Sequence, residues 1–403
     1  MINLNKFFFI CFATLQSPTA FSWGARGHDM ATQAAVKVFE VRYGKLHPHA
    51  AEVFKEKAFL LGYLSNVPDV YWKSLPRKIT KSLNPSHYVD LEYVLAKPSY
   101  ENFPLGLEKF VTTAIKNCPE TPLAKRTDCS KLTKKTLLQT SGSATFRVGQ
   151  FYNLALASAT KLKALDPKNT KRIKKSGSKE EGSLRKKRQG LMNEILLNSG
   201  LLSHFVADLA QPLHTTADYD GWEVSQGGLH SYCETAVIDE YPFGFFDEVV
   251  KWALENKPSE KVLSGISKLH KNELNRNDGD RGEGKLVAVD FATSLSLNSF
   301  ALKEELFEID RKFSLIKASK GAKKDSSGKV ISEKVRAKRR SASEAADGYR
   351  EFTKKRLAMA ADSLAFLWHQ LLKNAGNPSF KGYKSYYFPT QPQPTNLDYL
   401  GDE

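Results

Sequence analysis

The residues best suited to chemistry lie in the stretch LLSHFVADLAQPLHTTADYDGWEVSQGGLHSYCET, residues 201–235. His204 and Asp208 are four positions apart, so on a helix their side chains share one face. Pro212 is expected to close or kink that helix. His214 then follows on the next turn or loop. The first half of this stretch therefore offers two imidazoles and a carboxylate within a short distance along the chain.

A second pair of the same residue types follows the polar loop TTADYDGWEVSQGG. His230 and Glu234 are again four positions apart, and two such pairs joined by a short loop can converge on one site. Histidine nitrogen and carboxylate oxygen are the ligands that zinc accepts when thiolates are absent. Ligands that project from facing helices are an established way to build a site of several metal ions. The spacing therefore predicts a metal site.

Two further candidates lie upstream. Asp69 follows Pro68 amid apolar residues, a setting in which an isolated aspartate is more often a helix cap than a ligand. His87 lies in NPSHYVDLEY and, taken alone, is more typical of a structural histidine. The remaining histidines have exposed, turn-like or amphipathic helical contexts and are not predicted to bind metal; they are His47, His49, His270 and His369.

The elements that must position these residues are predicted to be helices. Apolar residues recur at helical spacing in DMATQAAVKVFEVRYG, SATFRVGQFYNLALASATKLKAL, LMNEILLNSGLLSHFVADLA and KRLAMAADSLAFLWHQLLKNAG. Few segments alternate as strands do, so the fold class is predicted to be all-α. Two basic, low-complexity segments, about 168–189 and 317–340, are predicted to be mobile insertions or charged helix extensions. The Pro-rich tail 381–403 is predicted to be irregular.

The overall charge is strongly basic. The 403 residues carry 60 Lys and Arg against 44 Asp and Glu, a formal charge of +16. Such a surplus indicates either a polyanionic partner, such as nucleic acid or an anionic lipid surface, or a solvated basic face. The hydrophobic content of 41% is sufficient for a core and argues against wholesale disorder.

The first 22 residues have the pattern of a secretory signal. Lys6 is followed by the apolar run FFFICFATL and by Pro18, and small residues precede a cleavage point before Trp23. No later stretch is apolar enough for a membrane span. We therefore expect a secreted or periplasmic mature chain without a transmembrane segment. In an oxidising compartment Cys118 and Cys129 could form a disulfide, leaving Cys233 as a buried thiol.

The order of several motifs resembles a known superfamily. WGARGH at residue 23, a later Pro-Asp, then SHYVD, HFVADLAQPLH and GGLHSYCE occur as in the trinuclear zinc phosphodiesterases. That superfamily includes bacterial zinc-dependent phospholipase C and the secreted single-strand-type nucleases of fungi and plants. The motifs span residues 23–234, about half of the chain. The resemblance implies one multi-helix domain over residues 23–380, with a zinc cluster in a cleft between helices.

The resemblance also implies roles for individual residues. Asp69, His87, His204 and Asp208 would hold one zinc ion. His214, His230 and Glu234 would hold a second. The third would be bound by His28, by Asp208 as a bridge, and by the free amino group and carbonyl of Trp23. Asp69 would also act as general base, as proposed for the phospholipase branch.

The branch within the superfamily is left open by the motifs. WGARGH and SHYVD resemble the nucleases, and Tyr88 stands where an aromatic ring could stack on a base or pack beside the site. The basic surplus also suits a nucleic-acid substrate. Against this, the closing ligand Glu234 and the loop DYDGWEVSQGG resemble the phospholipases. Tyr219 and Trp222 in that loop could line the substrate cleft or pack the loop.

The expected activity is therefore hydrolysis of a phosphodiester by a metal-activated water, with a nuclease favoured. A phospholipase C that acts on phospholipid headgroups is the alternative. A third possibility is an exported zinc-containing protein that binds polyanions without cleaving them. In each case the partner is nucleic acid or phospholipid, and no stable protein partner is implied.

Overall fold

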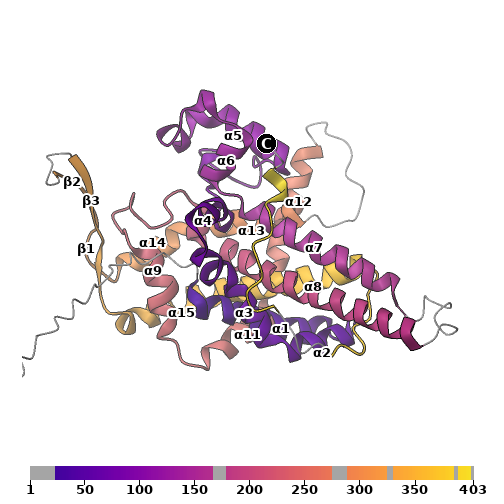
Figure 1. Ribbon diagram of the computed structural model, residues 1–403. Coiled ribbons are helices and arrows are strands. Elements are labelled where there is room, and N and C mark those ends of the chain that lie inside the picture. The colour runs from indigo at the N-terminus through magenta and orange to yellow at the C-terminus, as the bar shows by residue number, and fades with distance from the viewer. Residues whose placement is uncertain (1–22, 167–177, 275–287, 325–329, 385–388, 401–403) are drawn as a thin grey trace, which may run out of the picture.

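The computed structural model describes residues 23–166, 178–274, 288–324, 330–384 and 389–400 (Figure 1). The described chain is predominantly helical, which confirms the all-α prediction. The predicted signal segment 1–22 lies outside the described residues. The α-helices are α1 (Gly24–Tyr43), α2 (Pro48–Glu56), α3 (Ala58–Val70), α4 (Arg77–Leu83), α5 (Leu107–Asn117), α6 (Lys134–Ser141), α7 (Ala144–Ala164), α8 (Ser178–Ala210), α9 (Leu229–Ser231), α10 (Val237–Asp239), α11 (Phe245–Asn256), α12 (Ser259–Leu274), α13 (Ala288–Phe300), α14 (Lys303–Arg311) and α15 (Ala342–Asn374).

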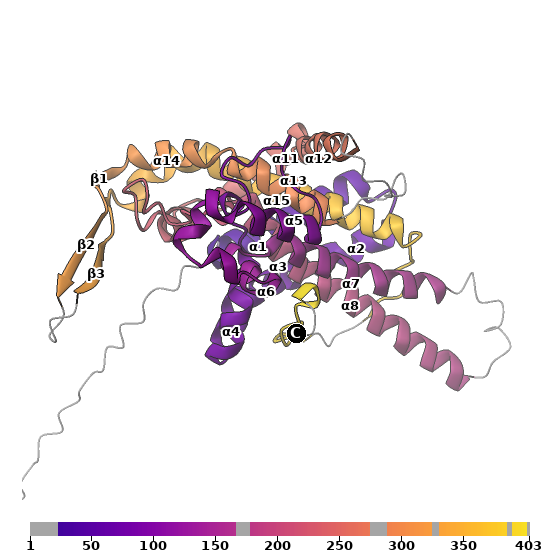
Figure 2. The same cartoon turned by 90° about the horizontal axis from the view of Figure 1, so that it is seen from above.

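Helix α8 is the element around which the site is built. The beginning of α8 is exposed and carries charged residues of the first basic segment, which is therefore in part a helix extension. This end of α8 lies beside α7 and projects away from the other helices (Figures 1 and 2). Its second half packs between α7 and α3, and the apolar side chains there are buried. Gly200 permits the close approach of α3, because a Cβ atom at this position would lie 2.6 Å from Cβ of Leu64. Helix α8 ends at Ala210, as Pro212 predicts.

The beginning of α1 is pressed against a segment far along the chain. Trp23 and Gly24 have φ angles of 39° and 51°, and a Cβ atom at Gly24 would lie 3.0 Å from the carbonyl oxygen of Glu234. Glycine is therefore required here both by conformation and by space. The indole Nε1 of Trp23 donates a hydrogen bond to the carbonyl of Ala207 at 2.7 Å, so the start of α1 is also joined to α8.

The segment that follows the 217–228 loop is a helix with one wide turn. It runs from α9 through a π-helical turn, Tyr232–Ala236, into α10. Gly228 precedes it with a φ of 93°. Such π turns are frequent at functional sites because they change the direction of side chains within a helix. Here the turn contains Glu234 and directly follows the helical turn with His230.

A small amount of β structure lies outside the helical body. Strands β1 (Ser314–Ile316) and β4 (Lys338–Arg339) pair antiparallel, as do β2 (Ser319–Lys324) and β3 (Val330–Val335). The β2–β3 hairpin projects beside α14 (Figures 1 and 2). The basic segment 317–340 thus contains paired strands. The prediction of a mobile insertion or a charged helix extension is wrong for its described residues. Strand pairing depends on contacts between distant residues, which a charge pattern does not report.

The cysteines and the C-terminal tail agree with the predictions made from the sequence. Cys118 and Cys129 form a disulfide, and Cys233 is a buried free thiol. Within residues 389–400 the only regular element is a 3₁₀ turn, Asp398–Leu400. Among the described residues, no helix combines the length and apolar character that a membrane crossing requires.

Candidate metal centre

Four of the predicted ligands converge in a first cluster, which consists of Asp69, His87, His204 and Asp208. Asp69 comes from α3, His87 from the 3₁₀ turn Asn84–His87, and the other two from one face of α8. Nδ1 of His87 lies 2.9 Å from Nε2 of His204, and 3.5 Å and 3.4 Å from the nearest oxygens of Asp69 and Asp208. Nε2 of His204 lies 3.2 Å from Asp208 and 4.0 Å from Asp69.

These separations match a tetrahedral metal site. With metal–ligand bonds of about 2.0–2.2 Å, the ligand atoms around a tetrahedral zinc ion lie about 3.3–3.5 Å apart. The five separations given for the first cluster scatter around that value. All four side chains are buried. The first cluster therefore has the ligand types, spacing and enclosure for one metal ion.

A second cluster consists of His214, His230 and Glu234. Nε2 of His230 lies 3.1 Å from Nε2 of His214 and 2.6 Å from Oε2 of Glu234, and His214 lies 3.8 Å from the same oxygen. Oε1 of Glu234 and Nδ1 of His230 are buried without a hydrogen-bond partner in the described part of the chain. Nε2 of both histidines and Oε2 of Glu234 converge, and these three atoms could hold a cation.

A third group lies where α1 meets the first cluster. Nε2 of His28 lies 3.4 Å from Oδ1 of Asp208 and 3.8 Å from Oδ2 of Asp69. The opposite oxygens of both carboxylates face the first cluster, so each aspartate lies between two groups of ligands. The backbone N–H of Trp23 donates to Oε2 of Glu234 at 3.0 Å, which places the start of α1 against the second cluster.

Hydrogen bonds to the backbone orient two of the imidazoles. Nδ1 of His204 lies 2.7 Å from the carbonyl of Ser65, and Nδ1 of His214 lies 2.7 Å from the carbonyl of His87. A carbonyl accepts only from a protonated nitrogen, so Nδ1 carries a hydrogen in both residues and Nε2 is the nitrogen that faces the cluster. This second layer of contacts is characteristic of metal-binding histidines.

The charges in the centre also suit cation binding. Burial lowers the pKa of His28 to about 3, with His204 adding to the effect, and burial and Lys73 lower the pKa of His87 to about 4. Burial opposes ionisation of Asp208, but His204 and His214 hold its pKa well below the usual range. Neutral imidazoles and ionised carboxylates are the forms that bind metals.

His214 differs from the other imidazoles. Burial lowers its pKa, but the carboxylates of Asp208 and Glu234 outweigh burial and raise it to about 9. A metal ion bound at the second cluster therefore has to displace a proton from His214 at neutral pH. The ion would take over the role of this proton in offsetting the two carboxylates.

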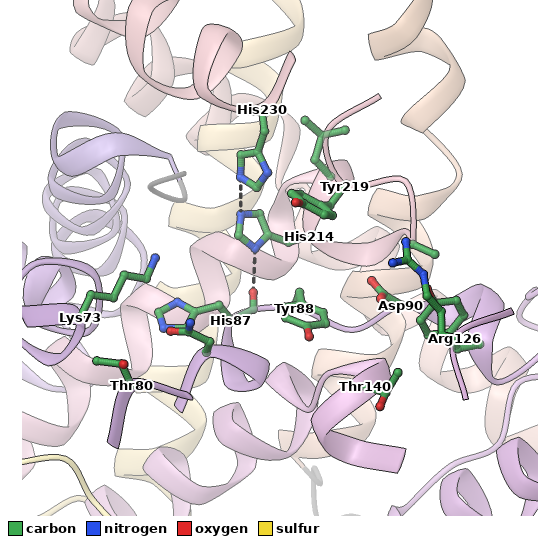
Figure 3. Close-up of a pocket in the computed structure, with 14 residues that line it drawn as sticks. Lys73, Thr80, His87, Tyr88, Asp90, Arg126, Thr140, His214, Tyr219 and His230 are labelled. Carbon is green, nitrogen blue, oxygen red and sulfur yellow. Dashed lines mark hydrogen bonds between the residues drawn. The ribbon is translucent and has the colours of Figure 1, made fainter. Parts of the chain in front are cut away.

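The clusters border an open cavity of about 580 Å³. His87, His214 and His230 line its inner side, as Figure 3 shows, with Lys73 and Thr80 on one side and Tyr88, Asp90 and Arg126 on the other. Leu213 and Ala217 are the aliphatic residues in the lining; the rest of it is polar, charged or aromatic: Lys73, Thr80, Asn84, His87, Tyr88, Asp90, Tyr93, Arg126, Thr140, His214, Tyr219 and His230.

The candidate substrate contacts Tyr88, Tyr219 and Trp222 have different positions. Tyr88 lines the cavity. Trp222 is not among the lining residues: its Nε1 donates to Asp220 at 2.8 Å, and the Lys334 ammonium lies 5.0 Å above its ring. Tyr219, three positions earlier in the same loop, lines the cavity instead. The side of a loop residue depends on the loop's conformation, which the sequence pattern does not reveal.

Three further cavity residues were not singled out from the sequence. Lys73 pairs with Asp69 at 2.5 Å, and the spacing of four between them on neighbouring helical turns is a signal that could have found it. Burial and Glu92 raise the pKa of Asp90 well above its usual range, and its place in SHYVD was also visible. Arg126 lies in the loop closed by the disulfide and carries no sequence signal.

The histidines that were not predicted to be ligands lie in other contacts. Nε2 of His47 lies 2.9 Å from Nδ1 of His369, and Nε2 of His270 lies 2.9 Å from Asp290. His49 is exposed and lies 3.9 Å from Glu52.

Comparisons of the chain with protein families, curated proteins and solved structures find no match. The function is therefore inferred from the residues of the site.

Proposed function

We propose that this protein is a zinc-dependent phosphodiester hydrolase that cleaves nucleic acid, as the resemblance to the trinuclear zinc phosphodiesterases implies. The observation that carries the proposal is that both buried clusters reach one open cavity, the first through His87 and the second through His214 and His230. Imidazole and carboxylate ligands without thiolate are compatible with zinc, and two histidines with a glutamate are a ligand set of catalytic zinc sites. Zinc ions in both clusters would place positive charge beside the cavity, where it could bind a phosphodiester.

Each ion would have its own ligands. The first cluster would hold one zinc ion with four side chains, and the second cluster would hold another with three. The third ion would bind His28, Asp208 and the terminal amino group and carbonyl of Trp23. Asp208 would be shared, since its two oxygens face different groups of ligands. Zinc ions in these positions would lower the pKa of water to about 7 and offset the charge of the phosphoryl oxygens.

The protein side chains would bind and orient the substrate and move a proton. Asp69 is ionised next to the Lys73 ammonium and borders both the first cluster and His28, so it can accept a proton from the attacking water. Lys73 points into the cavity and can contact a phosphate oxygen. Tyr88 and Tyr219 offer aromatic rings on which a base can stack.

The composition of the cavity favours a nuclease over a phospholipase C. Tyrosine rings beside basic side chains suit a base joined to a phosphate. Leu213 and Ala217 are the only aliphatic residues in the described lining, so its apolar surface comes mostly from aromatic rings and from the carbon atoms of polar side chains. Phospholipase C activity remains the alternative that the closing ligand Glu234 suggests, and the experiment includes it.

The test is to incubate purified mature protein with single-stranded DNA, RNA and phosphatidylcholine, with and without a chelator. We expect nucleotide release that the chelator abolishes and that added zinc restores. Phosphocholine release without nucleotide release would assign the protein to the phospholipase branch. DNA retained but never cleaved would identify a binding protein. Elemental analysis of the same samples should give about three zinc ions per chain, and fewer than two in fully active protein would contradict the mechanism.

A further inference from the structure

The β2–β3 hairpin is a strongly basic arm next to the metal centre. In its register Lys320 stands directly opposite Lys334. The exposed basic side chains on and around the described part of the arm are Lys317, Lys320, Lys334, Arg336, Lys338 and Arg340. Like charges opposite each other on neighbouring strands destabilise a hairpin. In the free protein, an ion pair of Lys320 with Glu223 and the contact of Lys334 with the Trp222 ring offset part of this repulsion.

The base of the arm is joined to the loop that precedes the ligand His230. The backbone N–H of Ala318 donates to the carbonyl of Ser225 at 2.8 Å, and that of Ala337 donates to Gly227 at 2.9 Å. The loop ends at Gly228, and α9 with His230 begins at the next residue. The arm and the second cluster are thus parts of one connected segment of structure.

A buried ion pair holds the same base in place. Nε of Arg339, on β4, donates to Asp310 of α14 at 2.6 Å, and both side chains are buried. Oη of Tyr349 donates to the same carboxylate at 2.5 Å, and Nε2 of Gln226 donates to it at 2.9 Å. This network links the arm to α14, to α15 and to the loop, so the orientation of the hairpin base is well defined.

The lysine-bearing face of the arm is turned toward the wall of the cavity. Side chains of Lys320 and Lys334 share one face because they are directly paired. Lys320 pairs with Glu223 at 2.6 Å, and Lys334 lies over the ring of Trp222. Both partners belong to the 217–228 loop, of which Tyr219 lines the cavity. The 217–228 loop carries Asp218, Asp220 and Glu223 and no basic residue, so the arm supplies the positive charge beyond this loop.

We propose that the hairpin binds the phosphate backbone of a polynucleotide strand outside the catalytic cavity. The proposal rests on the proposed nuclease function and specifies how a long substrate is bound. Lys320 and Lys334 lie side by side across the two strands, so they can contact one phosphate or two neighbouring phosphates together. Arg336 follows β3 directly and can contact a further phosphate. Phosphate binding would offset the remaining repulsion between the two lysines.

An anionic membrane is a less suitable partner. Surface-binding elements insert aromatic or large aliphatic side chains below the headgroups, and residues 317–340 contain no aromatic residue. The sequence between the two strands, DSSGK, is polar. The test nevertheless includes vesicles, so that the two partners are separated by measurement.

The test compares two charge-matched triple variants. The hairpin variant carries Lys320→Gln, Lys334→Gln and Arg336→Gln. The control carries Arg185→Gln, Lys186→Gln and Lys187→Gln, three exposed residues of the same types near the beginning of α8. That end of α8 lies on the opposite side of the molecule from the hairpin in both views (Figures 1 and 2). Both variants have the same net charge.

Binding is measured on chelator-treated protein, so that cleavage plays no part. A labelled 30-mer of deoxythymidine is titrated at 0.1 to 1 M salt. Each lost phosphate contact lowers the salt slope by about 0.7, so the hairpin variant should lose about 2 from the slope and up to about 100-fold in affinity at 0.1 M salt. The loss should shrink as the oligonucleotide is shortened to two residues. The control should keep the wild-type slope.

Three results would overturn the proposal. Equal losses in both variants would show a general effect of net charge. An unchanged salt slope in the hairpin variant, with native circular dichroism, would exclude phosphate contacts. Weaker binding to phosphatidylserine vesicles but not to DNA would assign the arm to a membrane. If the wild type binds the 30-mer through the hairpin but cleaves no nucleic acid, the proposed function fails and this inference stands.

Discussion

Replacing Asp208 with asparagine is the most direct test of the metal centre. Oδ1 of Asp208 faces His28, whereas Oδ2 lies between His87 and His204. Asparagine has nearly the same shape, but it lacks the charge and replaces one oxygen with an amide nitrogen that cannot bind a cation. The substitution therefore weakens two ion sites at once and leaves the second cluster intact.

The magnitude follows from the number of ligands. Structural zinc sites with four ligands bind with about 10–16 kcal/mol, or about 2.5–4 kcal/mol per ligand. Loss of one ligand should therefore lower affinity by about 10²- to 10³-fold at each of the two sites. We expect the zinc content after dialysis to fall from about three ions to about one, and phosphodiesterase activity to be lost.

The assay combines elemental analysis, hydrolysis of single-stranded DNA and circular dichroism. Asp290→Asn is the matched control, because Asp290 is a similarly buried carboxylate that pairs with His270 rather than with the centre. An Asp208→Asn protein with three zinc ions and full activity would refute the bridging role. An equal loss of zinc in both variants would show that general destabilisation explains the result.

Three further predictions follow from the same geometry. Lys73→Gln should lower the turnover number about 10- to 100-fold with little loss of zinc. Lys73→Arg should retain most of the activity, because it keeps a cation beside Asp69. Equal losses in the two variants would exclude a role for the charge. Two variants of the mature protein should lose the third zinc ion selectively. A chain extended by one residue before Trp23 has no free amino group on Trp23, and in Gly24→Ala the new Cβ atom would lie 3.0 Å from the carbonyl oxygen of Glu234. Unchanged zinc content in both variants would contradict this prediction. Metal-free protein should be easier to unfold with urea at pH 5 than at pH 7. His28 and His87 have pKa values of about 3 and 4 in the folded protein, against about 6.5 in the unfolded chain. The unfolded chain therefore binds more protons below pH 6.5, which lowers the free energy of unfolding by about 2 kcal/mol per histidine at pH 5. The stabilisation from His214, whose pKa is raised to about 9, is fully present below pH 6.5 and is lost only as the pH rises toward 9, so it does not reverse the sign; a flat stability profile between pH 5 and 7 would contradict the burial of neutral imidazoles.

Local patterns in the sequence were sufficient to predict much of the site. The spacing of four between His204 and Asp208, and between His230 and Glu234, places each pair on one face because the period of a helix is a property of the backbone. The end of α8 before Pro212 has an equally local cause, the missing N–H and the fixed φ of proline. The helical fold class follows from the same periodicity.

Contacts between distant segments decided the rest. Arg126 reaches the cavity through the disulfide loop, Trp222 is turned away from it while Tyr219 lines it, and the basic segment 317–340 pairs as a hairpin next to the ligand loop. None of these positions follows from spacing along the chain, because each depends on packing between residues far apart in sequence. The sharing of Asp208 between two groups of ligands has the same origin. The residue types and their helical faces were determined by the sequence alone, and the arrangement of those faces around one cavity was decided by the tertiary structure.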